Sequence, residues 1–272
     1  MTPETAAAAA AAAATRPTRL AWRVATVVAV RDETARARTL VLDVPEWPGH
    51  RAGQHVDVRL VAEDGYEAQR SYSIASPPEE ATVALTVERL DDGEVSPYLV
   101  DTLQVGDGLE LRGPIGGYFV WTAADGGPLL LVAGGSGVVP LAAMLRHHAH
   151  AAALPAALPA AHPAAHAPVP VRLLYSVRTL QDAIFREELE RLGARAEVDV
   201  VLTLTRDAPG DWTGYRRRID RAMLEQVAWP AAARPHVFVC GPTPLVESVA
   251  TLLVALGHDP SCVRTERFGA TG

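Results

Sequence analysis

The stretch Leu129-Leu-Leu-Val-Ala-Gly-Gly-Ser-Gly-Val-Val-Pro140 decides the fold of the second half of this chain. Its apolar run, Leu129–Ala133, is typical of a parallel strand that is covered on both faces. Glycines follow, and the helical pattern of Val139–His147 comes next. This order places backbone N–H groups and a helix N-terminus where a pyrophosphate can bind. We interpret the segment as a nucleotide-binding turn, with Pro140 in place of the last glycine of G-x-G-x-x-G. The alternative is a tight structural turn.

Downstream of this turn, strand patterns alternate with helical patterns, which predicts a doubly wound parallel sheet. The predicted strands are Val171–Ser176, Glu197–Thr205 and His236–Cys240, and the predicted helices are Asp182–Leu192, Asp220–Val227 and Leu245–Leu256.

Upstream of the turn, short alternating apolar runs are separated by Gly, Pro and Asp, which predicts an antiparallel barrel or sandwich. The runs are Trp22–Val30, Thr39–Val44, His55–Val61, Thr82–Leu90 and Leu109–Arg112, with one helix near Ser96–Leu103. The pattern changes at Asp125-Gly-Gly127. We therefore predict one domain over residues 18–124 and a second over residues 125–272.

Two low-complexity segments lie outside these patterns. Residues 1–17 are Ala-rich, and we predict a disordered tail. Residues 147–170 are rich in Ala, Pro and His, and we predict a surface insertion in the second domain. The five histidines of the insertion match no metal-site spacing, so we predict no metal site.

The composition of the 272 residues excludes several chemistries. All 25 basic residues are Arg, since the chain has no Lys; this excludes a Walker-type loop and a Schiff-base lysine. Two Cys cannot form a Cys₄ iron–sulfur site. The net charge of −7 disfavours a nucleic-acid partner. Without a long apolar stretch or a basic leader, we predict no stable membrane anchor and a cytoplasmic location.

Arginines follow two neighbouring strands of the predicted parallel sheet. Arg178 comes after the second strand, where NAD-selective sites commonly carry an acid for the ribose diol. Thr205-Arg206 ends the third strand, and Arg216-Arg-Arg218 follows farther on. Because a guanidinium binds phosphate through two parallel hydrogen bonds, we predict NADP rather than NAD. The alternative is that each arginine is a solvated surface charge.

Two motifs of the first half combine a cation, an aromatic ring and hydroxyl groups. Arg70-Ser-Tyr-Ser73 begins a strand, and Gly93-Glu-Val-Ser96 precedes the predicted helix, whose N-terminus is suited to an anion. Taken by their composition alone, these residues also fit an ordinary strand and a capping serine.

The order of five motifs resembles that of the ferredoxin–NADP⁺ reductase family, in a short bacterial form. The resemblance covers Thr18 to Gly272 apart from the insertion. The five motifs are Arg70-x-Tyr72-Ser73, Gly93-x-x-Ser96, Gly134-Gly-Ser-Gly-x-x-Pro140, Cys240-Gly241-Pro242 and Glu266-Arg267-Phe268-Gly269.

The resemblance implies a six-stranded antiparallel FAD-binding barrel followed by a parallel-sheet NADP-binding domain. In the barrel, Arg70 would bind the FAD pyrophosphate, Tyr72 would pack on the flavin and Ser73 would bond near its N5. Gly93 to Ser96 would hold the pyrophosphate at a helix N-terminus. Further expected cofactor contacts in the barrel are Ser71, Val87, Gly93, Val95 and Ser96.

In the second domain, the resemblance places the NADP pyrophosphate on Gly135, Ser136 and Gly137. The 2′-phosphate would bind Thr205 and Arg206, with Arg178 beside them. Cys240 would lie beside the nicotinamide in a positioning role, not as a nucleophile. The remaining expected cofactor contacts are Gly241, Pro242 and Phe268.

The C-terminal motif supplies the last expected site residues. Glu266 is a predicted proton-path or electron-path residue, so the expected catalytic set is Ser73, Cys240 and Glu266. The chain continues through Gly269 to Gly272, so Phe268 is not a terminal aromatic. Cys262 has no motif around it and is expected to be structural.

The predicted activity is hydride transfer from NADPH to flavin N5, followed by single-electron transfer to a separate carrier. We expect that carrier to be a ferredoxin or a similar iron–sulfur protein, since the chain has no cysteine cluster of its own. The main alternative is an NADH-dependent reductase component of an oxygenase system. The motifs also fit a flavin-binding electron-transfer subunit with little independent NAD(P)H turnover, or a non-catalytic nucleotide-binding scaffold.

Overall fold

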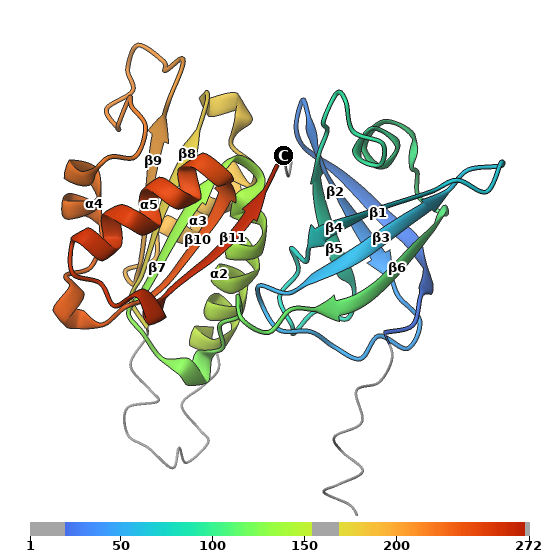
Figure 1. The fold of residues 1–272 in the computed structure, drawn as a ribbon, viewed down its shortest axis with the longest axis horizontal. Helices are drawn as coiled ribbons and strands as arrows, with labels where there is room; N and C mark the ends of the chain where they lie inside the picture. The colour runs from blue at the N-terminus through green and yellow to red at the C-terminus, as the bar shows by residue number, and fades with distance from the viewer. Residues whose placement is uncertain (1–19, 154–168, 270–272) are drawn as a thin grey trace, which may run out of the picture.

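A computed structural model describes residues 20–153 and 169–269, and the first half of them forms a closed antiparallel sheet (Figure 1). The strand order is β4-β3-β6-β1-β2-β5. An antiparallel bridge between Ile74 and Leu85 joins the two edges, and the Ala75 N–H donates to the Ala84 carbonyl at 2.7 Å. The six strands are β1 (Arg23–Thr34), β2 (Ala37–Asp43), β3 (His55–Val61), β4 (Glu67–Ser73), β5 (Val83–Glu88) and β6 (Gly108–Ile115).

The predicted six-stranded antiparallel barrel is therefore confirmed. Alternate residues of its strands face inward and build one apolar core, which includes Leu40, Leu42, Val56, Leu85 and Leu111. The predicted helix near Ser96–Leu103 corresponds to a short π-helix, η1 (Tyr98–Thr102), which places Leu99 in that core.

The second half contains a parallel five-stranded sheet in the order β11-β10-β7-β8-β9. The predicted parallel sheet is confirmed, with one strand more than the sequence patterns indicated. The strands are β7 (Leu129–Gly134), β8 (Val171–Val177), β9 (Val198–Leu204), β10 (His236–Pro242) and β11 (Val263–Phe268). The missed strand, β11, lies at the sheet edge nearest the barrel (Figure 1) and has the sequence Val-Arg-Thr-Glu-Arg-Phe, without the apolar run of a central strand.

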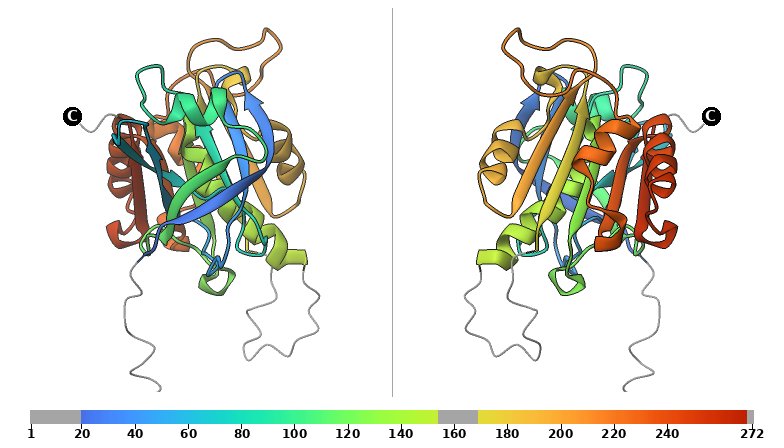
Figure 2. Two further views of the ribbon diagram at one scale, coloured as in Figure 1. Left: turned by 90° about the vertical axis from the view of Figure 1, so that its right-hand side faces the viewer. Right: turned by 90° about the vertical axis from the view of Figure 1, so that its left-hand side faces the viewer.

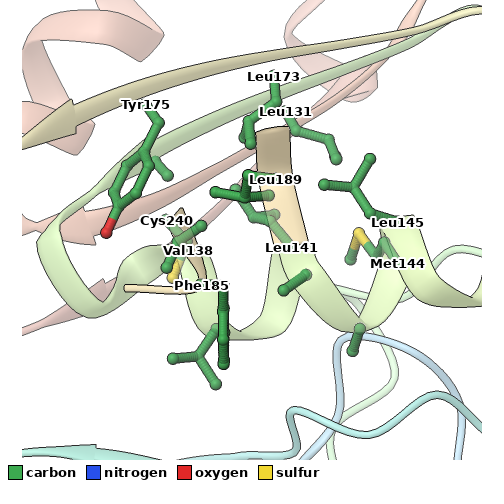
Figure 3. Packing of buried hydrophobic residues seen from close by; sticks show 14 of the residues in the cluster. Leu131, Val138, Leu141, Met144, Leu145, Leu173, Tyr175, Phe185, Leu189 and Cys240 are labelled. Carbon is green, nitrogen blue, oxygen red and sulfur yellow. The ribbon is translucent and has the colours of Figure 1, made fainter. Parts of the chain in front are cut away.

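Helices cover both faces of the parallel sheet, as Figure 2 shows. The helices are α2 (Val138–Ala153), α3 (Arg186–Gly193), α4 (Arg221–Val227) and α5 (Thr243–Ala255). Side chains of α2 and α3 pack with Leu131 and Leu173 on one face (Figure 3), whereas α4 and α5 pack with Leu130 and Val132 on the other. Alternate residues of β7 thus face opposite layers, which explains its uninterrupted apolar sequence.

Helix α2 also packs against the barrel, and it extends farther than the helical pattern of the sequence predicts. The helix continues to Ala153, so the predicted start of the insertion at residue 147 is wrong: the first residues assigned to it are helical. His147 Nδ1 lies 2.6 Å from Glu79 Oε1 of the barrel, and His148 is buried. Residues 154–168 of the insertion and the predicted tail, residues 1–17, lie outside the described residues.

The two halves are joined by polar contacts around Arg146 of α2. Its guanidinium donates to the Ala75 carbonyl of the barrel at 2.6 Å and binds both carboxyl oxygens of Glu188 on α3. It also lies over the Phe185 ring, 4.4 Å from its centre. Within residues 20–153 and 169–269, no helix combines the length and the apolar character needed to cross a bilayer.

Candidate functional site

The centre of the site is the point where the order of the parallel strands reverses. From β7 the chain crosses to β8 on one side, and β10 lies on the other side. In open α/β sheets, ligands bind at such a point, outside the carboxyl ends of the strands. The turn η3 (Gly135–Gly137) follows β7 there and leads into α2. The predicted nucleotide-binding turn thus lies at the position where this fold binds ligands.

Two glycines of this turn are required by its geometry. Gly137 is buried against β10, and a Cβ atom there would lie 2.2 Å from the carbonyl oxygen of Cys240. Gly135 has φ +53°, and a Cβ atom there would face Glu88 Oε2 at 3.8 Å. Gly135 and Ser136 are partly exposed, so they are available to a nucleotide, whereas Gly137 mainly permits the close approach of η3 to β10.

Glu88 is a feature of the site that sequence reasoning missed. It is the last residue of β5, so the barrel places a carboxylate beside the glycine turn of the other half. The sequence shows only a polar residue at the end of an apolar strand. That pattern does not reveal which loop of the other domain the residue faces.

Arg178 and Arg206 lie next to each other at the ends of β8 and β9. The Thr205 N–H donates to the Val177 carbonyl, and the Arg206 N–H donates to the Arg178 carbonyl, each at 2.9 Å. The Thr205 hydroxyl also donates to Val177, at 3.1 Å. Both arginines are exposed, and neither has a carboxylate within 4.0 Å among the described residues. The predicted pair of phosphate-binding arginines is thus brought together.

Two of the three arginines in the Arg216-Arg-Arg218 run are engaged elsewhere, whereas Arg218 is exposed and has no ion pair among the described residues. Arg216 donates to the carbonyls of Pro209 and Trp212, which stabilises its own loop. Arg217 forms an ion pair with Asp220, the N-cap residue of α4. These contacts distinguish Arg178 and Arg206 from Arg216 and Arg217.

In the barrel, Arg70 and the Gly93–Ser96 loop are brought together by an ion pair. Arg70 Nη2 lies 2.5 Å from Glu94 Oε2, and both side chains are about half exposed. Glu94 also accepts the Tyr66 hydroxyl at 2.7 Å. A carboxylate therefore lies against the guanidinium that is predicted to bind the FAD pyrophosphate.

The three residues after Arg70 differ in their burial and in their hydrogen-bond partners. Tyr72 and Ser73 are partly buried at the end of β4, and burial raises the pKa of Tyr72 to about 12, so its phenol stays neutral. The Ser71 hydroxyl donates to Asp57 at 2.6 Å, and Asp57 is ion-paired with Arg112. The side chain of Ser71 is thus part of a structural network.

Three predicted cofactor contacts of the barrel, Val87, Val95 and Ser96, have buried side chains, and their contact with a cofactor stays a prediction. Val87 is 1% exposed and Val95 is fully buried in the barrel core, so neither side chain presents surface to a ligand. The buried hydroxyl of Ser96 accepts the Leu90 N–H at 3.0 Å and thereby shapes the Leu90–Ser96 loop. A Cβ atom at Gly93 would lie 2.7 Å from that hydroxyl oxygen, so Gly93 is also required by the loop itself.

Cys240 and Glu266 are opposite each other in the β10–β11 pair, and the Cys240 thiol lies 4.0 Å from Glu266 Oε2. Figure 3 shows Cys240 near Val138, among the apolar side chains of the cluster. Burial and the nearby Glu266 carboxyl raise the pKa of the Cys240 thiol well above its ordinary value. The thiol therefore stays protonated, in keeping with a positioning role, and its contact with a nicotinamide stays a prediction.

Glu266 lies between the two halves of the protein. Its other carboxyl oxygen, Oε1, is 3.9 Å from His55 Nδ1 of β3 in the barrel. Burial raises the pKa of Glu266 to about 7, so the carboxyl can hold or release a proton near neutral pH. Phe268, two residues on, is partly buried opposite Pro242, next to buried Gly241.

The raised pKa of Glu266 predicts a pH-dependent contribution to stability. Between pH 4.5 and about 7 the folded state retains a proton that the unfolded state has lost, so this contribution falls as the pH rises. Relative to Glu266→Gln, the wild type should lose roughly 1 kcal/mol of unfolding free energy per pH unit between pH 5 and 7. Urea unfolding at pH 5, 6, 7 and 8 measures this difference. A constant difference would contradict the prediction, and Glu247→Gln, at an exposed carboxyl on α5, should show no such trend.

Comparisons with known proteins agree with this arrangement. The chain matches the family model of the oxidoreductase FAD-binding domain over residues 23–120 and that of the oxidoreductase NAD-binding domain over residues 131–251. Ferredoxin–NADP reductase B of Sorangium cellulosum is 34% identical over 253 residues, covering 90% of this chain and 96% of that protein. The chain belongs to the ferredoxin–NADP⁺ reductase family.

Two further relatives differ in length and in degree of similarity. A glycine betaine monooxygenase reductase subunit of Chromohalobacter salexigens is 34% identical over 251 residues, 90% of this chain, but this chain spans only 63% of that subunit. A ferredoxin–NADP⁺ reductase from Neisseria gonorrhoeae, solved with bound FAD and NADP, has a TM-score of 0.74 at 19% identity. It covers 90% of this chain and 98% of its own, and the likeness is one of fold.

The two family models confirm the predicted FAD-binding and NAD-binding domains. The residues fit both groups, since the site offers an exposed arginine pair at the strand ends, a glycine turn at the sheet switch point, and Arg70 beside Tyr72 and Ser73. The roles of the individual residues stay predictions.

Proposed function

We propose that this reductase uses NADPH to reduce a separate one-electron carrier. When bound, FAD supplies the chemistry that accepts a hydride from NADPH and releases electrons singly. The protein's own contribution is to bind, orient and protect the reacting groups.

Residues of the second half would bind NADPH, and residues of the barrel would bind FAD. Gly135 and Ser136 would hold the dinucleotide pyrophosphate, and Arg178 with Arg206 would bind the 2′-phosphate. Arg70 would bind the FAD pyrophosphate, while Tyr72 and Ser73 would position the flavin. Glu266 would hold a proton at its carboxyl beside the neutral thiol of Cys240.

The observation that carries the preference for NADPH is the exposed pair of Arg178 and Arg206. Arg206→Ala should raise the KM for NADPH roughly 10-fold or more, since a hydrogen bond between charged groups contributes about 1.5–3 kcal/mol. The KM for NADH should hardly change. Steady-state reduction of ferricyanide with each dinucleotide measures both values. Arg221→Ala, at an exposed Arg of α4, is the control, and equal effects of Arg206→Ala on both dinucleotides would overturn the assignment.

The electron acceptor is proposed to be another protein, a ferredoxin or similar iron–sulfur carrier. Support comes from the names of relatives, which are reductase components of oxygenase systems, such as the toluate 1,2-dioxygenase electron transfer component of Pseudomonas putida. These names equally support a reductase component of an oxygenase system, and such a component that uses NADH is the second candidate function.

Cytochrome c reduction with a panel of purified ferredoxins, using NADPH and then NADH, separates these two functions. Ferredoxin-dependent reduction that is faster with NADPH supports the first, and faster reduction with NADH supports the second. A colourless protein that FAD does not reconstitute would contradict both. We include a cytoplasmic location in the proposal.

A further inference from the structure

Glu88 belongs to the barrel but faces the glycine turn of the other half. It is the last residue of β5, and its Oε2 atom would lie 3.8 Å from a Cβ atom at Gly135. Apart from atoms of the turn itself, no other described atom comes within 4 Å of that Cβ position. The open side of Gly135 is thus directed at a carboxylate of the barrel.

The backbone of Glu88 is held in place by the barrel. Glu88 pairs with Ala37 of β2, and the N–H of the next residue, Arg89, donates to the Arg36 carbonyl at 2.7 Å. The Arg89 guanidinium lies 2.8 Å from Asp101, which fixes the chain directly after Glu88. The carboxylate therefore stays within side-chain reach of η3.

No cation neutralises Glu88 in the part of the chain that the structure describes. It forms no ion pair within 4.0 Å there, although three arginines lie at the paired ends of β2 and β5. Each of them binds an aspartate instead: Arg36 binds Asp91, Arg38 binds Asp32 and Arg89 binds Asp101. Since Glu88 is partly exposed, water hydrates its negative charge.

A negative charge at this place opposes the binding of a dinucleotide. The glycine turn offers backbone N–H groups to a pyrophosphate, which is itself an anion. Like charges a few ångströms apart repel each other, and more strongly near a protein surface than in bulk water. Arg178 and Arg206 lie one and two strands away, at the ends of β8 and β9. The site thus combines attraction at these strand ends with repulsion at the turn.

We propose that Glu88 sets the affinity for the dinucleotide by repelling the pyrophosphate at the glycine turn. The repulsion acts equally on oxidised and reduced dinucleotides, with or without a 2′-phosphate, because all of them carry the same pyrophosphate. Glu88 thereby weakens the binding of product as well as substrate, and the arginine pair offsets this only when a 2′-phosphate is present. This inference rests on the proposed position of the pyrophosphate at Gly135 and Ser136, but not on the choice between NADPH and NADH.

The test is the dissociation constant of NADP⁺ and of NAD⁺ for the FAD-loaded, full-length protein, measured by isothermal titration calorimetry. Glu88→Gln keeps the size of the side chain and removes its charge. It should tighten the binding of both dinucleotides about three- to tenfold at about 20 mM NaCl. Because salt screens the repulsion, the gain should shrink as the NaCl concentration rises to about 0.5 M. Adenosine 2′-monophosphate, which has no pyrophosphate, should bind wild type and variant alike.

Glu80→Gln is the matched control, because it removes the same charge from an exposed residue before β5, at the opposite end of that strand. It should leave both dissociation constants unchanged. Glu88→Arg extends the series and should bind both dinucleotides more tightly than Glu88→Gln does.

Unchanged affinity of Glu88→Gln, or an equal gain in Glu80→Gln, would overturn the proposal. Weaker binding by Glu88→Gln would also overturn it, since the carboxylate would then accept a hydrogen bond from the dinucleotide. The proposed use of NADPH fails separately, if the wild type binds NAD⁺ more tightly than NADP⁺. In that case a gain in Glu88→Gln, lost at high salt, still supports the role of Glu88.

Discussion

Gly137→Ala is expected to destabilise the protein by about 3 kcal/mol or more. The added Cβ would lie 2.2 Å from the carbonyl oxygen of Cys240, 2.5 Å from its carbonyl carbon and 2.8 Å from the Gly241 nitrogen. All three are backbone atoms of β10, so no side-chain rotation relieves the overlap. Either η3 or the end of β10 must move, at the point where the sheet order reverses.

Urea unfolding monitored by circular dichroism measures the loss of stability. Gly210→Ala is the matched control, because Gly210 has an ordinary φ and nothing lies within 4 Å of its added Cβ. That variant should unfold within about 0.5 kcal/mol of the wild type, as surface substitutions usually do. Equal stability of the Gly137→Ala and Gly210→Ala variants would refute the close packing of η3 against β10. The KM for NADPH should also rise for Gly137→Ala, since Gly135 and Ser136 belong to the displaced turn.

The two sheets could be predicted from the sequence because the strands of each have a recognisable local pattern of apolar residues. In the barrel strands, apolar residues alternate with polar ones because only one face of each strand is buried. Strand β7 is apolar throughout because α2 and α5 cover its opposite faces. Strand β11 was missed because an edge strand needs fewer apolar residues, and its Arg264 and Glu266 interrupt the apolar pattern.

The site was predictable where backbone topology alone brings residues together. Arg178 and Arg206 follow neighbouring parallel strands, so their proximity follows from the strand order. His55 and Glu88 could not be found in this way. Each is a barrel residue that lies beside residues of the other half. The way in which two domains pack together cannot be predicted from a local sequence pattern. Val87 and Val95 were expected as contacts from the resemblance to the family, although each also fits an apolar position of the barrel core.

Arg70→Ala is expected to weaken FAD binding about 10- to 100-fold. Removal of a guanidinium that bonds a phosphate costs about 1.5–3 kcal/mol, and each 1.4 kcal/mol is a tenfold change in the dissociation constant. In the structure, Arg70 is ion-paired with Glu94, which competes for the same guanidinium. Since both side chains are about half exposed, this pair contributes at most about 1 kcal/mol, less than a phosphate contact. FAD should therefore displace Glu94 from Arg70.

Glu94→Gln isolates this competition, because it removes the negative charge and keeps a side chain of similar size. It should leave FAD affinity unchanged or tighten it by up to about fivefold, which corresponds to the roughly 1 kcal/mol limit for an exposed pair. Fluorescence titration of flavin-free protein with FAD measures both variants, and Arg38→Ala, at an ion pair with Asp32 on the barrel, is the control. If Arg70→Ala bound FAD as tightly as the wild type, Arg70 would have only its structural contact with Glu94. If Glu94→Gln weakened binding as much as Arg70→Ala, the carboxylate would hold the guanidinium in its binding position, and the two residues would act as one unit.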